Sequence, residues 1–145
     1  MKKYTTFLLG FCLLFSASAL AHKGATGIVK DRMDNFKASQ QALKQIFAAT
    51  KGGDVQAVVP LAEQIKVWAE KMPDYFPAGS NQSPSEAAAA IWTDFGGFSA
   101  AAARHGEAAS GLITAAGSGD IAATAAAAKQ LADTCKSCHQ RYRAD

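Results

Sequence analysis

The chain has 145 residues, with 15 lysines and arginines against 12 aspartates and glutamates, and three cysteines. A formal charge of +3 is too close to neutral to indicate nucleic acid or an anionic membrane as a partner. The length suits one domain with a modest core.

Residues 1–21 have the pattern of a secretory signal peptide. Two lysines precede an apolar run, Phe7–Phe15, and the small residues that follow predict cleavage after Ala21. The apolar run is shorter than the roughly 20 residues that span a membrane. We therefore expect an exported domain of residues 22–145 with no membrane insertion. Cleavage removes Cys12 and two of the 15 basic residues, which leaves 13 against 12 acidic ones.

The hydrophobic spacing of the remaining chain is helical almost throughout, and no stretch shows sustained two-residue alternation. A first helix is expected over residues 25–50, and Gly52–Gly53 should end it in a left-handed conformation. Asp54 is expected to cap a second helix, which ends before Pro73.

A connection rich in proline, glycine and serine follows over residues 73–86. It ends in a helix-start pattern, with Ser83 as N-cap, Pro84 at the first helical position and Glu86 closing a capping box. The third helix should run on from there. Gly96–Gly97 would allow it a bend or the close approach of another backbone.

A fourth helix should begin after Asp120, which can cap it. Two tight junctions and one longer loop predict an all-α protein with an antiparallel four-helix bundle. Because alanine-rich helices bury little area each, the core looks underfilled. A large apolar cofactor would supply the missing volume.

The sequence CKSCHQRYRAD closes the chain and contains the most specific motif. On a helix, Cys135, Cys138 and His139 lie on one face. The Cys-x-x-Cys-His spacing is the attachment signature of c-type haem. The two thiols form thioethers with one porphyrin, and the imidazole binds its iron. We therefore expect one covalently bound haem c per chain.

Three other interpretations of the motif are weaker. A thioredoxin-like dithiol lies at a helix N-terminus, where the helix dipole lowers the thiol pKa, whereas this pair lies near a C-terminus. A structural zinc site needs four ligands, and only His22 or His105 is left to complete it. A disulfide is allowed in an exported protein but gives His139 no role.

Three stretches occur in order along the chain: VKDRMDNF at 29–36, AIWTDFGGF at 90–98 and CKSCHQRYR at 135–143. Together they resemble the class II cytochromes c, the cytochrome c prime family. The resemblance covers nearly the whole of residues 22–145. It implies an exported four-helix bundle that encloses one covalently bound haem, with His139 as the proximal iron ligand.

The resemblance also implies roles on the first helix. Arg32 matches an arginine that pairs with a haem propionate, although the sequence alone is equally consistent with a solvated surface charge. Phe36 stands where low-spin members carry a ligating methionine, which implies a five-coordinate, high-spin haem with Phe36 as distal lid. Met33 lies on nearly the same helix face and remains an alternative sixth ligand or a core-filling side chain.

Further residues are expected around the cofactor or in the core. Trp92 and Phe95, with Phe98, would form an aromatic wall, and ordinary core packing predicts the same burial. His105 faces inward more than two turns further along the third helix. We expect it to form a hydrogen bond at the other end of the bundle, and we expect Met72 to pack in the core.

Two functions remain, and neither is enzymatic. One is a periplasmic electron carrier whose haem edge, near Lys136, Arg141 and Arg143, docks a redox partner protein. The other is binding of nitric oxide or carbon monoxide at a vacant distal position, whereas Met33 as sixth ligand would favour the carrier. No acid or base is placed near Phe36 for peroxidase chemistry. The resemblance allows a monomer or a homodimer through the first two helices.

Overall fold

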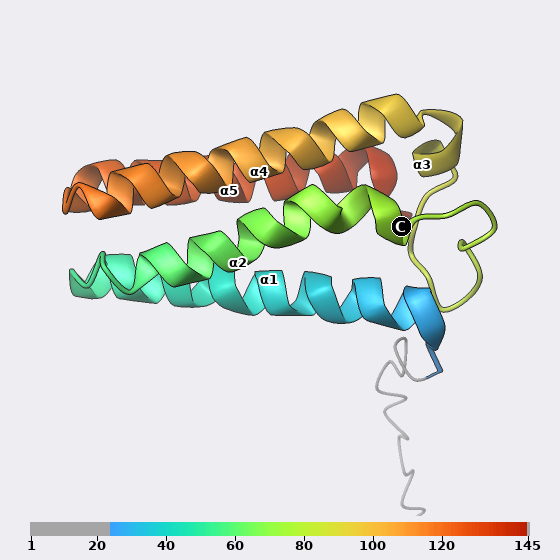
Figure 1. Ribbon diagram of the computed structural model, residues 1–145, viewed down its shortest axis with the longest axis horizontal. Coiled ribbons are helices and arrows are strands. Elements are labelled where there is room, and N and C mark those ends of the chain that lie inside the picture. Colours follow the sequence, from blue (N-terminus) through green and yellow to red (C-terminus); the bar gives the residue numbers. More distant parts are fainter. Residues whose placement is uncertain (1–23, 145) are drawn as a thin grey trace, which may run out of the picture.

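The computed structural model describes residues 24–144. The predicted signal peptide over residues 1–21 and His22 lie outside the described residues. Within the described part the chain forms four long helices: α1 (Gly27–Gly52), α2 (Val58–Lys71), α4 (Phe95–Gly117) and α5 (Ile121–Tyr142). They lie alongside one another (Figure 1), which confirms the predicted all-α four-helix bundle.

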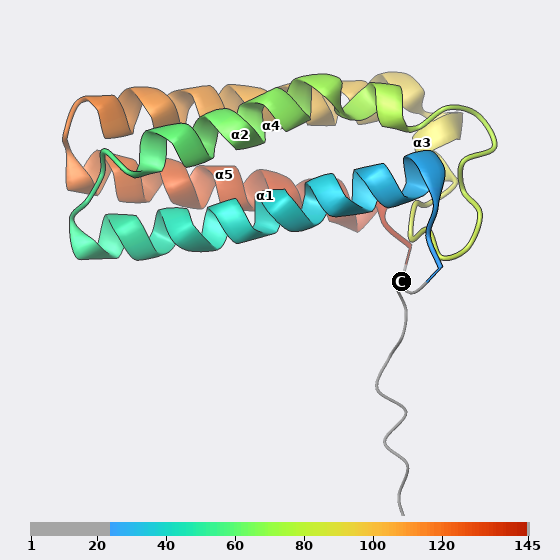
Figure 2. The same cartoon turned by 60° about the horizontal axis from the view of Figure 1, so that its bottom comes forward.

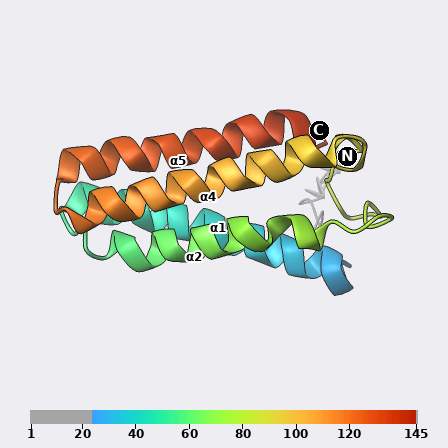
Figure 3. The ribbon, with the colours of Figure 1, turned by 45° about the horizontal axis from the view of Figure 1, so that its top comes forward.

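The long helices run alternately up and down the bundle. α1 packs against α2 and α5, and α4 packs against the same two helices, so that the four form a closed square (Figure 2). The two tight junctions lie at one end. The longer connection and the C-terminal end of α5 meet at the opposite end (Figure 3). No described helix is long and apolar enough to cross a membrane.

The tight junctions follow the sequence pattern at Gly53 and Asp120. Gly53 ends α1 with a left-handed φ of 82°, and Asp54 Oδ1 accepts a hydrogen bond from the Ala57 N–H at 3.2 Å. Asp120 Oδ1 accepts one from the Ala123 N–H at 2.9 Å. Asp120 is therefore the N-cap of α5, as expected. The expected Asp54 cap of α2 is wrong: α2 begins at Val58 after Ala57, which makes no side-chain capping hydrogen bond, and Asp54 holds the turn before the helix instead.

The predicted helix start at Ser83–Glu86 is wrong. A short 3-10 helix (Met72–Tyr75) follows α2, a four-residue α3 (Ala90–Thr93) comes next, and the third long helix begins only at Phe95. Its N-cap is Asp94, whose Oδ1 accepts from the Gly97 N–H at 3.2 Å.

Contacts with the end of α5 replace the capping box. The Glu86 carboxylate forms an ion pair with Arg143 at 2.6 Å, and the Glu86 carbonyl accepts from the Ala144 N–H at 2.8 Å. Glu86 therefore pairs with a residue 57 positions further along the chain and does not close a capping box.

The core consists of two clusters. An aliphatic cluster near the tight junctions contains residues such as Ile46, Ile65 and Leu112. An aromatic cluster lies toward the end with the longer connection; its buried members are Trp68, Met72, Phe76, Ile91, Phe98, Ala101, Ala102 and Tyr142. Met72 packs in the core as expected.

Gly97 allows the close approach of α4 to α5. A Cβ atom there would lie 2.2 Å from Asp94 Oδ2 and 2.6 Å from the Tyr142 hydroxyl. Moving either group would break hydrogen bonds, since the Tyr142 hydroxyl donates to Asp94 Oδ2 at 2.9 Å and Arg141 donates to the same oxygen at 2.8 Å.

We therefore expect Gly97→Ala to lower the free energy of unfolding by about 1–3 kcal/mol, as overpacking does. Urea denaturation followed by far-UV circular dichroism measures this change. The matched control is Gly96→Ala, because a Cβ at Gly96 meets nothing within 4 Å. This control should be neutral or stabilise by up to about 1 kcal/mol. Equal stabilities of the two variants would contradict the prediction.

Candidate functional site

The Cys-x-x-Cys-His motif lies in the last turns of α5, at the end of the bundle where the aromatic cluster lies. Cys135 and Cys138 are half-buried free thiols, and Cys138 packs against the aromatic cluster. Burial raises the pKa of both thiols, whereas a redox-active dithiol needs a lowered one. The thioredoxin-like interpretation therefore gains no support.

His139 lies one residue further along α5 and is exposed. Partial desolvation and the nearby Arg143 hold its pKa below the usual value, while Glu86 acts in the opposite direction. The neutral imidazole, which is the form that binds metal ions, is thus favoured. Over residues 24–144, no group of three or more histidine, cysteine or acidic side chains could hold a metal ion. The zinc interpretation therefore has no structural support.

His105 lies beside the motif, so the expectation that it lies at the other end of the bundle is wrong. Its Nδ1 is 2.7 Å from Thr134 Oγ1, and Thr134 directly precedes Cys135. Because α4 and α5 are antiparallel, the first half of α4, which includes His105, faces the second half of α5, which includes Thr134. The expected hydrogen bond itself is present.

The direction of that hydrogen bond follows from its neighbour. The Thr134 hydroxyl gives its single proton to the Leu131 carbonyl at 2.6 Å, so His105 Nδ1 must carry a proton and donate it. Burial, with a smaller contribution from His139, lowers the pKa of His105 from 6.5 to about 4. His105 is therefore neutral near pH 7.

Arg32 is only 2% exposed, which excludes the solvated surface charge. Its Nη1–H groups donate to the Tyr75 carbonyl at 3.3 Å and to Ser80 Oγ at 2.9 Å. Its Nη2–H groups donate to the Ser80 carbonyl and to Ser85 Oγ. The guanidinium also stacks 4.5 Å from the centre of the Phe76 ring. All four acceptors are neutral, and no carboxylate among the described residues pairs with Arg32.

Phe36 packs against the aromatic cluster from α1. Its ring meets the Trp68 ring edge-on at 5.3 Å and the Phe76 ring at 6.4 Å. Met33 is half-buried and belongs to neither described core cluster. Phe36 is thus an α1 side chain that packs against the same aromatic cluster as Cys138.

The two residues expected in an aromatic wall differ in position. The Trp92 indole N–H donates to the carbonyls of Phe76 and Pro77 at 3.1 and 3.0 Å, which ties α3 to the longer connection. Phe95 is 43% exposed and lies at the outside of the cluster, while Phe98 is the buried ring.

Trp68 and Phe76 were missed in the sequence interpretation. Trp68 stands three residues after Ile65 and so continues the apolar stripe of α2, which was a usable signal. Phe76 lies in the connection after α2, where no periodic pattern marks a core residue.

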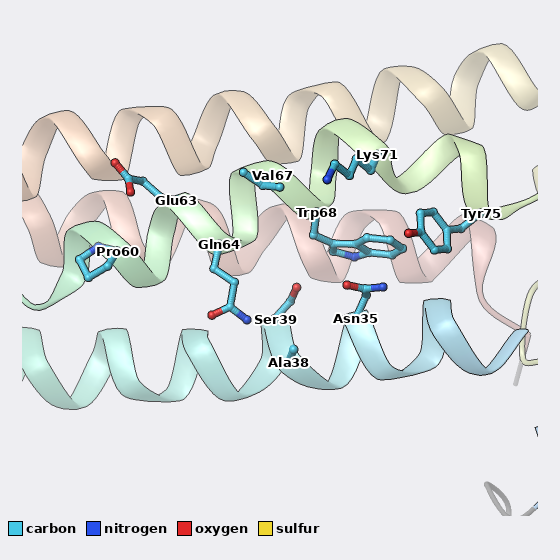
Figure 4. A pocket seen from close by; sticks show the side chains of 10 residues that line it. All are labelled: Asn35, Ala38, Ser39, Pro60, Glu63, Gln64, Val67, Trp68, Lys71 and Tyr75. Atoms are coloured by element: carbon cyan, nitrogen blue, oxygen red, sulfur yellow. The ribbon is translucent and has the colours of Figure 1, made fainter. Parts of the chain in front are cut away.

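Two of the hollows on the described surface lie near residues of the site. One, of about 190 Å³, lies between α4 and α5 and is lined by residues that include Arg104, Cys138 and Tyr142. The other, of about 410 Å³, is a groove between α1 and α2 that reaches Trp68 and Tyr75 (Figure 4). Ligand pockets usually measure roughly 300–1,000 Å³, so the hollow beside Cys138 takes only part of a large ligand.

Two polar groups near Phe36 lack the partner that their chemistry calls for. Arg32 is a buried cation without a carboxylate, and the buried indole N–H of Trp68 has no hydrogen-bond acceptor in the described structure. Such donors are uncommon, and each costs about 1–3 kcal/mol when unpaired. The residues present therefore suit an apolar ligand that carries acidic groups, which is the chemistry of a haem with its two propionates.

Comparison with known proteins identifies the family of this chain. The sequence profile of a family described as Cytochrome C' matches residues 27–143, which include the whole bundle and the motif. The chain therefore belongs to the cytochrome c' family, and its cofactor is a covalently attached haem c.

Individual relatives extend the match over most of the chain. Cytochrome c-556 of Agrobacterium fabrum is 35% identical over 143 residues, which are 99% of this chain and 95% of the relative. The crystal structure of cytochrome c' from Thermochromatium tepidum, 23% identical, covers 81% of this chain and 95% of its own with a TM-score of 0.75. A structure of cytochrome c prime from Alcaligenes xylosoxidans, also 23% identical, covers 81% and 94% with a TM-score of 0.73. Both structures share the fold.

Proposed function

We propose that Cys135 and Cys138 hold the haem through thioether bonds and that the His139 imidazole is its proximal ligand. The support is the motif, its position on α5 against the aromatic cluster, and a lowered pKa that leaves the imidazole neutral. When bound, the haem supplies reversible one-electron chemistry and an iron atom that can take a small gas. The protein would then be an exported, periplasmic monohaem cytochrome.

The proposed spin state of the iron depends on Phe36. Its ring lies in the cluster that contacts Cys138, edge-on to Trp68, and a hydrocarbon ring has no atom that ligates a metal. We therefore assign Phe36 as the lid over the distal position of a five-coordinate, high-spin haem. Arg32 supplies a charge for one propionate. Met33 as sixth ligand of a low-spin carrier is the alternative that the experiment below separates.

Electron transfer is the first function. Around the motif, Lys136 is exposed, while Arg141 and Arg143 are tied to Asp94 and Glu86. These pairs hold two guanidinium groups close to the motif, where they would contribute to docking of a redox partner protein. Because the pairs neutralise part of the charge, we expect only a weak dependence of docking on salt.

Binding of nitric oxide or carbon monoxide is the second candidate, because a lid without a ligating atom leaves room for a small molecule. The cytochrome c prime of Alcaligenes xylosoxidans has been solved as nitric oxide and carbon monoxide complexes of variants. Another fold neighbour is described as having ligand-controlled dimer dissociation. For this chain, a homodimer through α1 and α2 stays a prediction for size-exclusion chromatography with light scattering.

The deciding experiment uses exported protein from a host that attaches haem. Mass spectrometry should show one added tetrapyrrole, and the ferrous optical spectrum should be high-spin and should change with carbon monoxide. An unmodified mass would overturn the proposed function. A low-spin ferrous spectrum that carbon monoxide does not alter would overturn the Phe36 assignment; Met33→Ala should then convert that spectrum to high-spin if Met33 is the ligand.

A further inference from the structure

The indole N–H of Trp68 is a buried hydrogen-bond donor that no described residue accepts. Trp68 is 5% exposed, and the nitrogen itself is closed to solvent, so water in the neighbouring groove cannot reach it. Figure 4 shows the indole beside Tyr75, between α2 and α1, with Asn35 opposite on α1. The Asn35 amide donates to the Asp31 carbonyl at 2.8 Å, and no hydrogen bond joins it to the indole.

The surroundings of Trp68 connect it to Arg32. The Trp68 ring lies 5.1 Å from the Tyr75 ring and 5.3 Å from the Phe36 ring. Arg32 donates to the Tyr75 carbonyl and stacks on Phe76, whose ring lies 6.4 Å from that of Phe36. A cation and an unpaired N–H therefore border the same group of rings, which Phe36, Tyr75 and Phe76 form.

Arg32 has little hydrogen-bonding capacity left for a ligand. A guanidinium has five N–H groups, and four of them already donate to Tyr75, Ser80 and Ser85. Only Nε–H remains. Arg32 therefore offers mainly its uncompensated charge, and a carboxylate placed there needs a donor from another residue.

We propose that Trp68 is that donor: its indole N–H binds the haem propionate whose charge Arg32 balances. The inference rests on the proposed haem attachment and adds a residue from α2 to the binding of the cofactor. A propionate is favoured over a gas on the iron, because a carboxylate is the stronger acceptor for an N–H beside a cation.

The test compares Trp68→Phe with Trp92→Phe in the haem-loaded protein. Both changes remove an indole N–H and keep an aromatic ring, but the N–H of Trp92 already has two carbonyl acceptors. A hydrogen bond to the charged form of a carboxyl group lowers its pKa. Trp68→Phe should therefore raise the propionate pKa by about one unit, which is a tenfold gain in proton affinity. Trp92→Phe should leave this pKa unchanged.

The measured quantity is the reduction potential as a function of pH. In the acid range the slope of this curve changes at the pH where the propionate titrates, so the position of that bend gives the propionate pKa. Equal bends in both variants would overturn the proposal. It would also be overturned if Trp68→Phe shifted only the C–O stretching frequency of the carbon monoxide complex, because the N–H would then face the bound gas. Loading is checked first by mass, so an unloaded wild-type chain would count against the proposed function and not against this inference.

A second measurement covers the case in which Trp68→Phe does not fold. In the Trp92→Phe protein, Trp68 provides the single indole N–H among the described residues. Its nitrogen-15 resonance in the ferrous carbon monoxide form should move as the propionate titrates. A resonance that does not depend on pH would overturn the proposal and indicate that Asn35 or another neutral group is the acceptor.

Discussion

Replacing Arg32 with methionine should lower the free energy of unfolding of the haem-loaded protein by about 3 kcal/mol or more, since hydrogen bonds to charged groups contribute about 1.5–3 kcal/mol each. Four donors would be lost, and the acceptors on buried Ser80 and on half-buried Tyr75 and Ser85 would lose their partners. The change would release the connection between α2 and α3 from α1.

Urea denaturation followed by circular dichroism measures this effect. Lys30→Met is the matched control, because Lys30 lies on the same helix and forms only an exposed pair with Asp34. The control should change stability by less than about 0.5 kcal/mol. Arg32→Lys should fall between the two, as it keeps the charge but loses the fork of donors. An Arg32→Met protein as stable as the control would show that this network contributes nothing.

The second large effect is a pH dependence that His105 confers. The pKa of His105 is about 4 in the folded chain and 6.5 in its ordinary state, so the unfolded chain binds a proton that the folded chain rejects. Above pH 6.5 the residue does not lower the free energy of unfolding. As the pH falls from 6.5 toward 4, protonation of the unfolded chain lowers this free energy. The loss amounts to about 3 kcal/mol at 1.36 kcal/mol for each pKa unit.

The measurement is urea denaturation of wild type and His105→Gln between pH 7 and pH 4. Glutamine can still donate to Thr134 but does not titrate in this range. Carboxylates titrate in both proteins, so the difference between the two pH profiles gives the contribution of His105 to the free energy of unfolding. Profiles that stay parallel over the whole range would contradict the assigned burial and the neutral imidazole.

Local patterns in the sequence predicted much of this molecule. Residues within a few positions of one another are enough to indicate the four long helices, the glycine end of α1, the Asp120 cap of α5 and the face shared by Cys135 and Cys138. Such signals depend on helix geometry and capping alone. The haem motif is likewise a local spacing.

The errors have a common physical origin, which is contact between distant parts of the chain. Glu86 is paired by Arg143 and so does not begin a helix. His105 lies beside Thr134 because of the register between α4 and α5, which neither helix encodes by itself. The environment of Arg32 could not be predicted either, since its neutral acceptors lie in a connection without a recognisable pattern.

The separation of the core into two clusters has a consequence for the order of assembly. The aliphatic cluster draws on residues 42–131 around the two tight junctions and includes none of the motif. Contacts between helices joined by short turns form quickly. We expect a newly made polypeptide to consolidate this half first, as a scaffold that presents both sulfhydryl groups on an anchored helix before the tetrapyrrole arrives.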